Sequence, residues 1–448
     1  MTTNSVNTNT LSIFKLSMPM LMSLVLEQII GLTDVIFLGR VSEVSVGAAA
    51  IGGIGFFVFT MIAMGYGIAS QSQMGIANGS KDYSLIGKIF VQSLYFFTAF
   101  LVLLAVVLPF VIPYLFEIGI QSPNVRAEAY SYFVWRMVGI GFAFICIAFR
   151  GFFMAILQPA VLTYSSFVMV ASNCILNYLL IFGIGPFPAL GIAGAAIAST
   201  LAEFLAVIFF VAYALYKKCH LKYGLFHWAK PDKELQILLF KLGRYMMMQE
   251  TVLMTSWLLF FVWVEHMGER ALAVSNIVRS VSNLMFIIVH AFGSTCGSIG
   301  ANLLGENRAT EVDSMMKRGL KLSFVITIPL AFLIAVYPEP LLVLFTDIPS
   351  LRMDSVDSLR VMLSAYLLCV PAYHYFLAFG FLGATRESMI ISFISIFAYT
   401  TYCYLITNWA EQVATVWTAD WFYYVITSIC VLYFWKRLSW RSIYIKKS

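Results

Sequence analysis

Twelve long apolar segments constrain this chain more than any other feature of its sequence. Each is long enough to cross a bilayer, for which a helix needs about 20 mainly apolar residues. None alternates between apolar and polar residues, which excludes a membrane β-barrel. We therefore predict an all-α polytopic membrane protein with twelve transmembrane helices. The segments cover residues 14–38, 48–76, 88–113, 129–155, 159–183, 190–216, 236–264, 271–303, 318–346, 357–383, 387–408 and 413–435.

The composition supports a chain that faces lipid. Only 11% of its 448 residues are charged and 61% are hydrophobic, whereas a soluble domain carries about 25% charged residues. The seven cysteines are isolated from one another and from suitably spaced histidines, so we expect neither a metal site nor a disulfide framework.

The distribution of positive charge predicts the orientation. With twelve spans both termini lie on one side, and 21 of the 28 Lys and Arg residues fall on that side. By the positive-inside rule both termini are cytoplasmic, and we expect an inner-membrane location. Topology thus explains the net charge of +6 without a nucleic-acid partner. The residues on the opposite side are Arg40, Arg126, Arg136, Arg270, Arg279, Arg352 and Arg360.

A Lys-rich polar joint at 220–233 divides the chain into two halves of six spans. A shift of 226 positions pairs Lys15 and Leu16 with Lys241 and Leu242. An even number of spans per half predicts parallel repeats, hence two six-helix lobes around a central cavity. The predicted divisions are a cytoplasmic tail at 1–13, an N-lobe at 14–218, a cytoplasmic linker at 219–235, a C-lobe at 236–436 and a cytoplasmic tail at 437–448.

Polar residues recur at helical spacing in three spans of the first half. They are Glu27 and Asp34, Asn173 and Asn177, and Ser199 and Glu203. Partners four or seven residues apart share one helix face. An acid at mid-membrane costs about 2.5 to 3.5 kcal/mol, which makes it a functional candidate. A carboxylate among amides and a hydroxyl suits reversible binding of H⁺ or Na⁺. Alternatively, Asp34 lies at the interface and pairs with Arg40, and the other two acids have similar structural roles.

The second half carries a broader polar set. It comprises Glu250, Asn276, Arg279, Asn283, His290 and His374. The four residues from Asn276 to His290 follow helical spacing and share a broad face. Arg279 can pair with Glu250 or bind an anionic group of a substrate. For the two histidines, a hydrogen-bonded core position is the favoured interpretation.

The chain lacks the motifs of nucleotide-driven transporters and of common enzymes. It contains no GxxxxGK[ST], no GxGxxG in a βαβ unit, no HExxH and no kinase signature. We therefore predict a protein that is not an enzyme, has no cofactor and takes its energy from an ion gradient.

Several segments resemble the multidrug and toxic compound extrusion (MATE) transporters, over nearly the whole chain. They include the acidic first-span motif at 32–39, the Gln- and Gly-rich end of the second span at 71–79 and the short joint that begins at Arg150. The segments Asn173–Gly183 and Gly191–Ser199 are the most specific.

The resemblance implies cation coupling through the first-span acid, Asp34, with polar positions of spans 5 and 6. Those positions are Asn173, Asn177 and Ser199, and we include the neighbouring Thr200 among the candidate coupling residues. With Na⁺ as the coupling ion, Asp34, Asn173 and Asn177 would be its ligands. Some relatives carry a second acid where this chain has Asn177. The span 7 acid of the NorM-like branch corresponds to Glu250, but Pro371 replaces its span 10 acid.

We predict a monomeric antiporter that exchanges H⁺ or Na⁺ for small organic compounds, cationic or amphipathic, by alternating access. Its partners would be the small-molecule substrate and the lipid bilayer. Alternatives are a flippase or exporter of a lipid-linked saccharide, an exporter of an anionic metabolite, and a receptor or scaffold without transport. The residues predicted to line the substrate cavity are Glu27, Glu203, Glu250, Asn276, Arg279, Asn283, His290 and His374.

Overall fold

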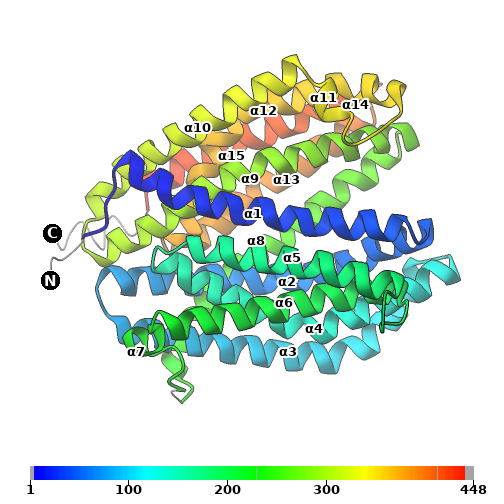
Figure 1. Ribbon diagram of the computed structural model, residues 1–448. Helices are drawn as coiled ribbons and strands as arrows, with labels where there is room; N and C mark the ends of the chain where they lie inside the picture. Colours follow the sequence, from blue (N-terminus) through cyan, green and yellow to red (C-terminus); the bar gives the residue numbers. More distant parts are fainter. Residues whose placement is uncertain (1–4, 229, 411, 439–448) are drawn as a thin grey trace. The chain divides into compact units, whose positions relative to one another are not determined.

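The computed structural model describes residues 5–228, 230–410 and 412–438, and every regular element among them is helical. Twelve helices are long and apolar enough to cross a membrane, which confirms the predicted fold class (Figure 1). The predicted tails at 1–13 and 437–448 include residues 1–4 and 439–448, which lie outside the described residues.

The helices alternate with short joints along the chain. The twelve long ones are α1 (Thr10–Gly39), α2 (Glu43–Gly79), α3 (Tyr83–Gly119), α4 (Pro123–Ala155), α5 (Ala160–Phe182), α6 (Gly191–Tyr216), α8 (Lys233–Glu265), α9 (Glu269–Gly305), α10 (Val312–Val336), α12 (Pro349–Phe381), α13 (Thr385–Thr407) and α15 (Thr418–Lys436). Four short elements complete the chain: α7 (Cys219–Tyr223), η1 (Ala309–Glu311), α11 (Glu339–Leu342) and α14 (Val413–Val416).

Local sequence explains where these helices begin and end. Asp82 accepts a hydrogen bond from the Leu85 N–H at 3.1 Å and caps α3. The segment predicted at 318–346 is shorter than expected, because α10 ends at Val336 and α11 follows as a separate turn. Proline disfavours helical geometry in the preceding residue, and Tyr337, just before Pro338, has an extended φ of −122°.

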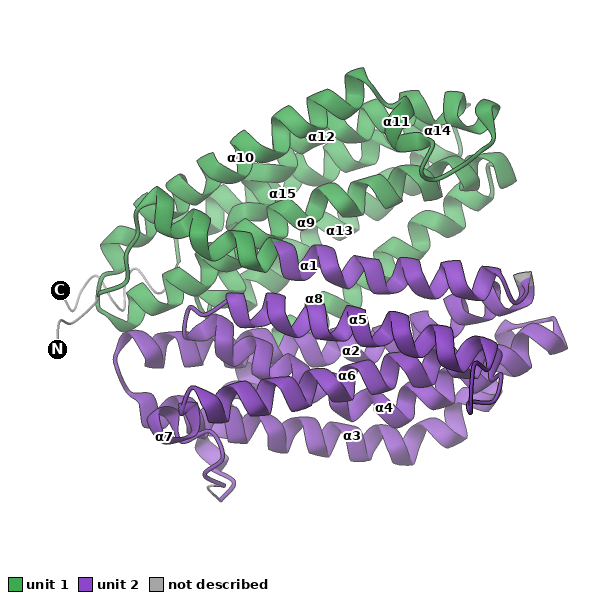
Figure 2. Cartoon of the chain, in the orientation of Figure 1, with its two compact units in different colours: residues 1–21, 244–448 green, residues 22–243 purple. Residues whose placement is uncertain are grey.

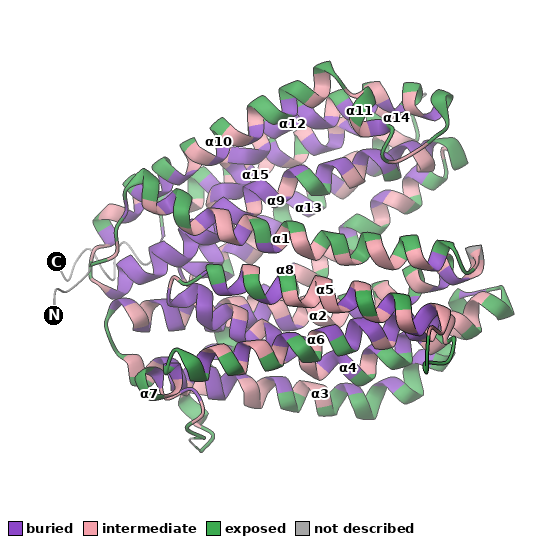
Figure 3. Ribbon diagram, in the orientation of Figure 1, coloured by how far each residue is buried: buried purple, intermediate pink, exposed green. Residues whose placement is uncertain are grey.

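Burial divides the helices into inner and peripheral ones. In the apolar part of α4 and of α12, 61% of the residues are buried. In the apolar part of α1, only 11% are buried. Exposed residues recur along α1, α3 and α10 (Figure 3). Many of them are large and apolar, such as Phe110 and Phe332. Exposed apolar side chains in this number fit a lipid environment.

The chain forms two compact units, shown in different colours in Figure 2. One comprises residues 22–243 and the other residues 1–21 with 244–448. In the first, α2 packs on α4, α4 on α6 and α5 on α6. In the second, the corresponding helices pack in the same way: α9 on α12, α12 on α15 and α13 on α15. The two units therefore repeat one packing pattern.

The start of the chain is fastened to the second of these units. The Val6 N–H donates to Glu306 at 2.9 Å, and Arg308 donates to the Val6 carbonyl at 2.9 Å. Arg318 donates to the Thr8 carbonyl at 2.8 Å. Acceptance by Glu311 and Glu306 raises the pKa of Arg308, so this guanidinium stays charged. These contacts explain why the first residues group with 244–448.

The residues before α8 are docked on α3. Gln92 donates to the Lys230 carbonyl at 3.1 Å and accepts from the Asp232 N–H at 3.1 Å. Lys88 forms an ion pair with Asp232 at 2.5 Å. At Gly87 a Cβ atom would lie 1.9 Å from the Tyr223 carbonyl oxygen, so only glycine permits this approach. The polar joint predicted as a linker is therefore held to α3 by backbone and side-chain contacts.

Asp232 also caps α8, because its Oδ1 accepts from the Leu235 N–H at 3.1 Å. We expect Asp232→Asn to loosen the docking on α3 and to keep this cap, since Asn is also a good N-cap. Lys88 lowers the pKa of Asp232 below its usual 3.8 through a hydrogen bond. The contribution of the Lys88–Asp232 pair to stability is therefore present above pH 3.8 and is lost as the pH falls through the lowered pKa. Hydrogen exchange at residues 230–236, corrected for intrinsic rates, should rise roughly twofold to fivefold at pH 7.

A matched control is Glu234→Gln, which removes a neighbouring charge whose side chain makes no ion pair among the described residues. Equal exchange in both variants at pH 7 would contradict the role of the ion pair. The difference in exchange between the two variants should also shrink as the pH falls toward the lowered pKa of Asp232, because the protonated carboxyl no longer pairs with Lys88.

Candidate functional site

Helices α1 and α5 are joined by polar contacts between residues 23–34 of α1 and residues 166–177 of α5. Four side-chain hydrogen bonds connect them, and the separation between partners stays between 139 and 143 residues. A constant separation means that the two helices run parallel in register. The pairs are Ser23–Ser166, Glu27–Ser166, Thr33–Asn173 and Asp34–Asn177. The polar stripes predicted on spans 1 and 5 therefore face each other.

Asp34 lies at the centre of a hydrogen-bond network built from three helices. Its Oδ1 accepts from Asn177 Nδ2 at 2.6 Å, and its Oδ2 accepts from Ser199 Oγ at 3.2 Å. Asn173 Nδ2 donates to Ser199 Oγ at 3.1 Å. The alternative pairing with Arg40 is not found, since Arg40 is exposed and forms no ion pair with Asp34 among the described residues.

The amides of this network donate to the carboxylate and to neighbouring acceptors. Asn177 Nδ2 uses its two protons on Asp34 and on Asn173 Oδ1, the latter at 3.1 Å. Asn173 and Asn177 are fully buried, and Asn177 Oδ1 has no hydrogen-bond partner among the described residues. A buried acceptor of this kind calls for an explanation. It leaves an oxygen beside the carboxylate with free lone pairs.

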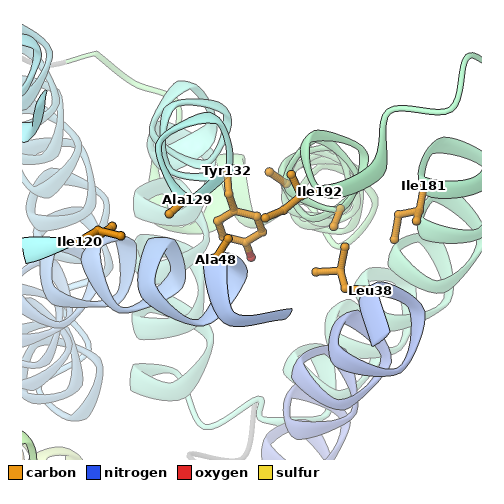
Figure 4. Close-up of a cluster of buried hydrophobic side chains, with 9 residues drawn as sticks. Leu38, Ala48, Ile120, Ala129, Tyr132, Ile181 and Ile192 are labelled. Atoms are coloured by element: carbon orange, nitrogen blue, oxygen red, sulfur yellow. The ribbon is translucent and has the colours of Figure 1, made fainter. Parts of the chain in front are cut away.

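An apolar cluster lies one helical turn from this network. Leu38 follows Asp34 by four residues, Ile181 follows Asn177 by four, and Ala195 precedes Ser199 by four. Figure 4 shows Ile192 beside Tyr132 of α4, with Leu38 between these two residues and Ile181. The cluster, made of Leu38, Ala48, Ile120, Ala129, Tyr132, Ile181, Ile192, Ala195 and Ala196, is buried. The apolar cluster therefore covers the polar network at the end toward Leu38 and Ile181, mainly with side chains that cannot coordinate a cation.

Two features of the site depend on α4. Thr200, predicted with the coupling residues, donates to the Trp135 carbonyl at 3.3 Å, not to Asp34. Glu203 forms an ion pair with Arg136, with Nη2 and Oε1 2.7 Å apart. Sequence reasoning placed Arg136 within the segment 129–155, on the side opposite the termini, and named no partner for it. It lies thirteen residues inside α4 and is 7% exposed. Its position within an apolar segment was the available signal.

Glu27 is also ion-paired. Arg150 near the end of α4 forms a close ion pair with it, and Ser166 donates to Glu27 Oε1 at 3.0 Å. Ser23 donates to the same oxygen at 3.3 Å. The two acids of α1, predicted to share a face, therefore contact α5 at two levels with different partners. Only the Asp34 level uses neutral donors alone within hydrogen-bond distance.

The polar residues of the other unit are arranged differently from the sequence expectation. Arg279 does not form an ion pair with Glu250 among the described residues. Its guanidinium lies 4.9 Å from the ring centre of Phe260 and 4.7 Å from that of Trp417, and it interacts electrostatically with Asp420. Asp420 of α15 is buried, and sequence reasoning did not single it out.

The remaining predicted residues of this unit have different surroundings in the described part of the chain. His374 is fully buried, and its Nε2 lies 3.1 Å from the Met316 carbonyl, which supports the core interpretation. The ring of His290 packs against that of Phe286, with the ring centres 6.2 Å apart and the planes tilted by 53°. Asn276 and Asn283 are exposed on α9. A role for these residues in a substrate cavity stays a prediction.

Comparison with known proteins identifies the repeated unit. The family model described as MatE matches twice, at residues 19–179 and at residues 246–406. The two matches begin 227 residues apart, close to the shift of 226 found within the sequence. Together they cover more than half of the chain. The two predicted repeats are thus copies of one known domain.

Individual relatives agree with this assignment. The chain is 22% identical to a probable multidrug resistance protein NorM of Haemophilus ducreyi over 87% of this chain and 84% of that protein. It is 26% identical to the probable multidrug resistance protein YoeA of Bacillus subtilis, over 78% and 76%. Both relatives are similar along most of their length.

Solved structures show the same fold. A multidrug resistance MATE family transporter in an outward-facing conformation superposes with a TM-score of 0.89 at 18% identity, covering 100% of both chains. A MOP superfamily transporter from Pyrococcus furiosus gives 0.88 at 18% identity, covering 99% of both chains. With two MatE domains, twelve spans and this fold, the chain belongs to the MATE family of multidrug efflux transporters, and its members are transporters, not enzymes.

Proposed function

We propose that this protein is a cation-coupled antiporter that exports small organic compounds, with Asp34 as the residue that binds the coupling ion. One observation carries the proposal: a carboxylate held by Asn177 and Ser199 lies beside a buried, unpartnered amide oxygen among the described residues. Neutral donors fix the carboxylate without neutralising it. A monovalent cation would therefore find both charge and oxygen ligands there.

The network also suits a proton. A protonated carboxyl carries an O–H that needs an acceptor, and an amide N–H cannot supply one. Ser199 Oγ can, because a hydroxyl rotates to accept as well as donate. We infer that H⁺ binds at the Asp34 oxygen that faces Ser199. Na⁺ would instead use the oxygens of Asp34, Asn173 and Asn177, which are hard ligands.

The surroundings of the Arg279 guanidinium favour organic cations or amphipathic compounds over anions as substrates. Phe260 and Trp417 lie against the guanidinium, and Asp420 interacts with it electrostatically, which partly offsets its charge. An anionic substrate would need an uncompensated positive charge, and the same holds for the phosphates of a lipid-linked saccharide. We therefore retain export of organic cations as the proposal, with both termini on the cytoplasmic side of the inner membrane.

The test is export from proteoliposomes under one gradient at a time. Vesicles with the purified protein are loaded with a fluorescent organic cation, and efflux is followed under a pH gradient and, separately, a Na⁺ gradient. Efflux driven by one gradient identifies the coupling ion. Absence of efflux under both, with protein correctly inserted, would contradict the proposal and direct the search to anionic or lipid-linked substrates.

A further inference from the structure

The ion pair between Arg136 and Glu203 lies inside the unit that holds Asp34 and is not explained by the coupling network. It joins α4 to α6 with a 2.7 Å contact between Nη2 and Oε1. The guanidinium carbon lies 3.7 Å from the ring centre of Phe56 on α2. The two side chains are only 9% and 14% exposed. Removing two charges from water is costly, so such a pair needs a reason.

The pair is next to the coupling network along α6. Glu203 follows Ser199 by four residues, one turn along the same face of α6. Asp34 interacts electrostatically with Arg136 and with Glu203. The Arg136 Nη1 and Glu203 Oε2 atoms are buried without hydrogen-bond partners among the described residues. The contact between the two side chains therefore leaves one polar atom of each without a hydrogen bond in the described part of the chain. Their charges also act on Asp34.

Close packing fixes this arrangement. A Cβ atom at Gly139 would lie 2.3 Å from Thr200 Cγ2, so glycine allows α4 to approach α6 at that level. Thr200 also donates to the carbonyl of Trp135, the residue before Arg136, at 3.3 Å. The charges of Arg136 and Glu203 are thus held at a set position relative to Ser199. A rigid charge acts on a neighbouring site without needing to reorganise.

The charges around Asp34 can be counted helix by helix. Helix α1 supplies Asp34, α4 supplies Arg136 and the phenol of Tyr132, and α6 supplies Glu203, while α5 supplies only neutral amides and α2 the ring of Phe56. With both acids ionised the group has a net charge of −1. Binding of one monovalent cation brings it to zero.

We propose that Arg136 and Glu203 are positioning residues that set the electrostatic potential at Asp34, so that the site takes up a single monovalent cation. The inference rests on the proposed coupling role of Asp34. Neither residue is a ligand of the cation. Their charges determine how strongly the cation is held.

Opposite single substitutions test this. Glu203→Gln leaves Arg136 uncompensated, so the cation should bind more weakly and half-maximal export should need about tenfold more H⁺ or Na⁺. Arg136→Gln leaves a second negative charge, so half-maximal export should need about tenfold less. With both substitutions the net charge returns to −1, and the midpoint should return to within about threefold of the wild type.

This pattern separates an electrostatic role from a purely structural one. A structural brace predicts that both single variants fail in the same way and that the double variant is no better. Midpoints shifted in the same direction, or a double variant further from the wild type than either single one, would overturn the inference. Glu128→Gln is the matched control, since Glu128 lies two turns earlier on α4 and accepts from Ser45 at 2.7 Å. Its midpoint should not move.

Two further measurements keep the test decisive. If Arg136→Gln does not accumulate, Arg136→Lys with Glu203→Asp conserves both charges, and an unchanged midpoint is expected. H⁺ or ²²Na⁺ binding to purified wild type and Asp34→Asn is measured alongside. No Asp34-dependent binding would mean that the proposed function fails. Binding that depends on Asp34 but is insensitive to Arg136 and Glu203 would mean that only this inference fails.

Discussion

Asp34→Asn is expected to abolish export driven by the ion gradient, with a loss of at least about 100-fold in coupled efflux. Asn has nearly the shape of Asp but no charge to hold a cation. Two unit charges 4 Å apart interact by about 4 kcal/mol at an effective dielectric constant of 20, equivalent to roughly a 1,000-fold change in affinity. Removing the charge therefore removes most of the binding free energy of the ion.

The measurement is efflux of the fluorescent cation from proteoliposomes that contain equal amounts of oriented protein. Arg40→Gln serves as the control, because it also removes one charge near the end of α1 but at an exposed residue. It should retain at least half of the wild-type rate. Coupled export by Asp34→Asn at a rate comparable with this control would show that the coupling ion binds elsewhere.

Gly194→Leu is expected to have the second-largest effect, through the packing of α5 on α6. A Cβ atom at Gly194 would lie 2.6 Å from the Leu180 carbonyl oxygen and 2.7 Å from its carbonyl carbon. Backbone atoms cannot yield as a side chain can, so the two helices must move apart. Overpacking of this kind costs about 1 to 3 kcal/mol. Separation of the helices also lengthens the 3.1 Å contact between Asn173 and Ser199.

We therefore expect this variant to melt at a lower temperature in detergent and to lose coupled export even where it folds. Gly47→Leu is the matched control, since a Cβ at Gly47 meets no atom within 4 Å. Both variants add the same apolar side chain to a helical glycine of the same unit. Equal melting temperatures and equal export would contradict the packing argument.

The sequence contains enough information for the helices and for the polar stripes, because both follow from local rules. Apolar run length predicts spans, and spacing of four or seven places Asn173 with Asn177 on one face. The family resemblance then brought these residues together with Asp34 and Ser199, as the structure does. The end of α10 at Val336 could also have been predicted from the sequence, since Pro338 disfavours helical geometry at Tyr337.

The pairings of the charged residues could not be predicted in the same way. Arg136 and Glu203 are 67 residues apart, and Glu27 and Arg150 are 123 apart. Which acid meets which arginine depends on the rotation and contact of whole helices, and single-helix periodicity does not determine it. Arg279 illustrates the point: the sequence suggested Glu250 as its partner, but it interacts with Asp420 on α15.

The order in which the coupling network appears on the ribosome has a consequence for biogenesis. Asp34 emerges in the first span, whereas its partners Asn177 and Ser199 are encoded 143 and 165 residues later. At 5 to 20 residues per second they follow after roughly 10 to 30 s. During that interval the Asp34 carboxylate lacks its partners from α5 and α6, and an acid even at the centre of a span costs about 2.5 to 3.5 kcal/mol, an upper bound for Asp34 near the end of α1. Nascent chains that end before α5 should therefore insert α1 less efficiently than longer ones, and Asp34→Leu should remove that difference.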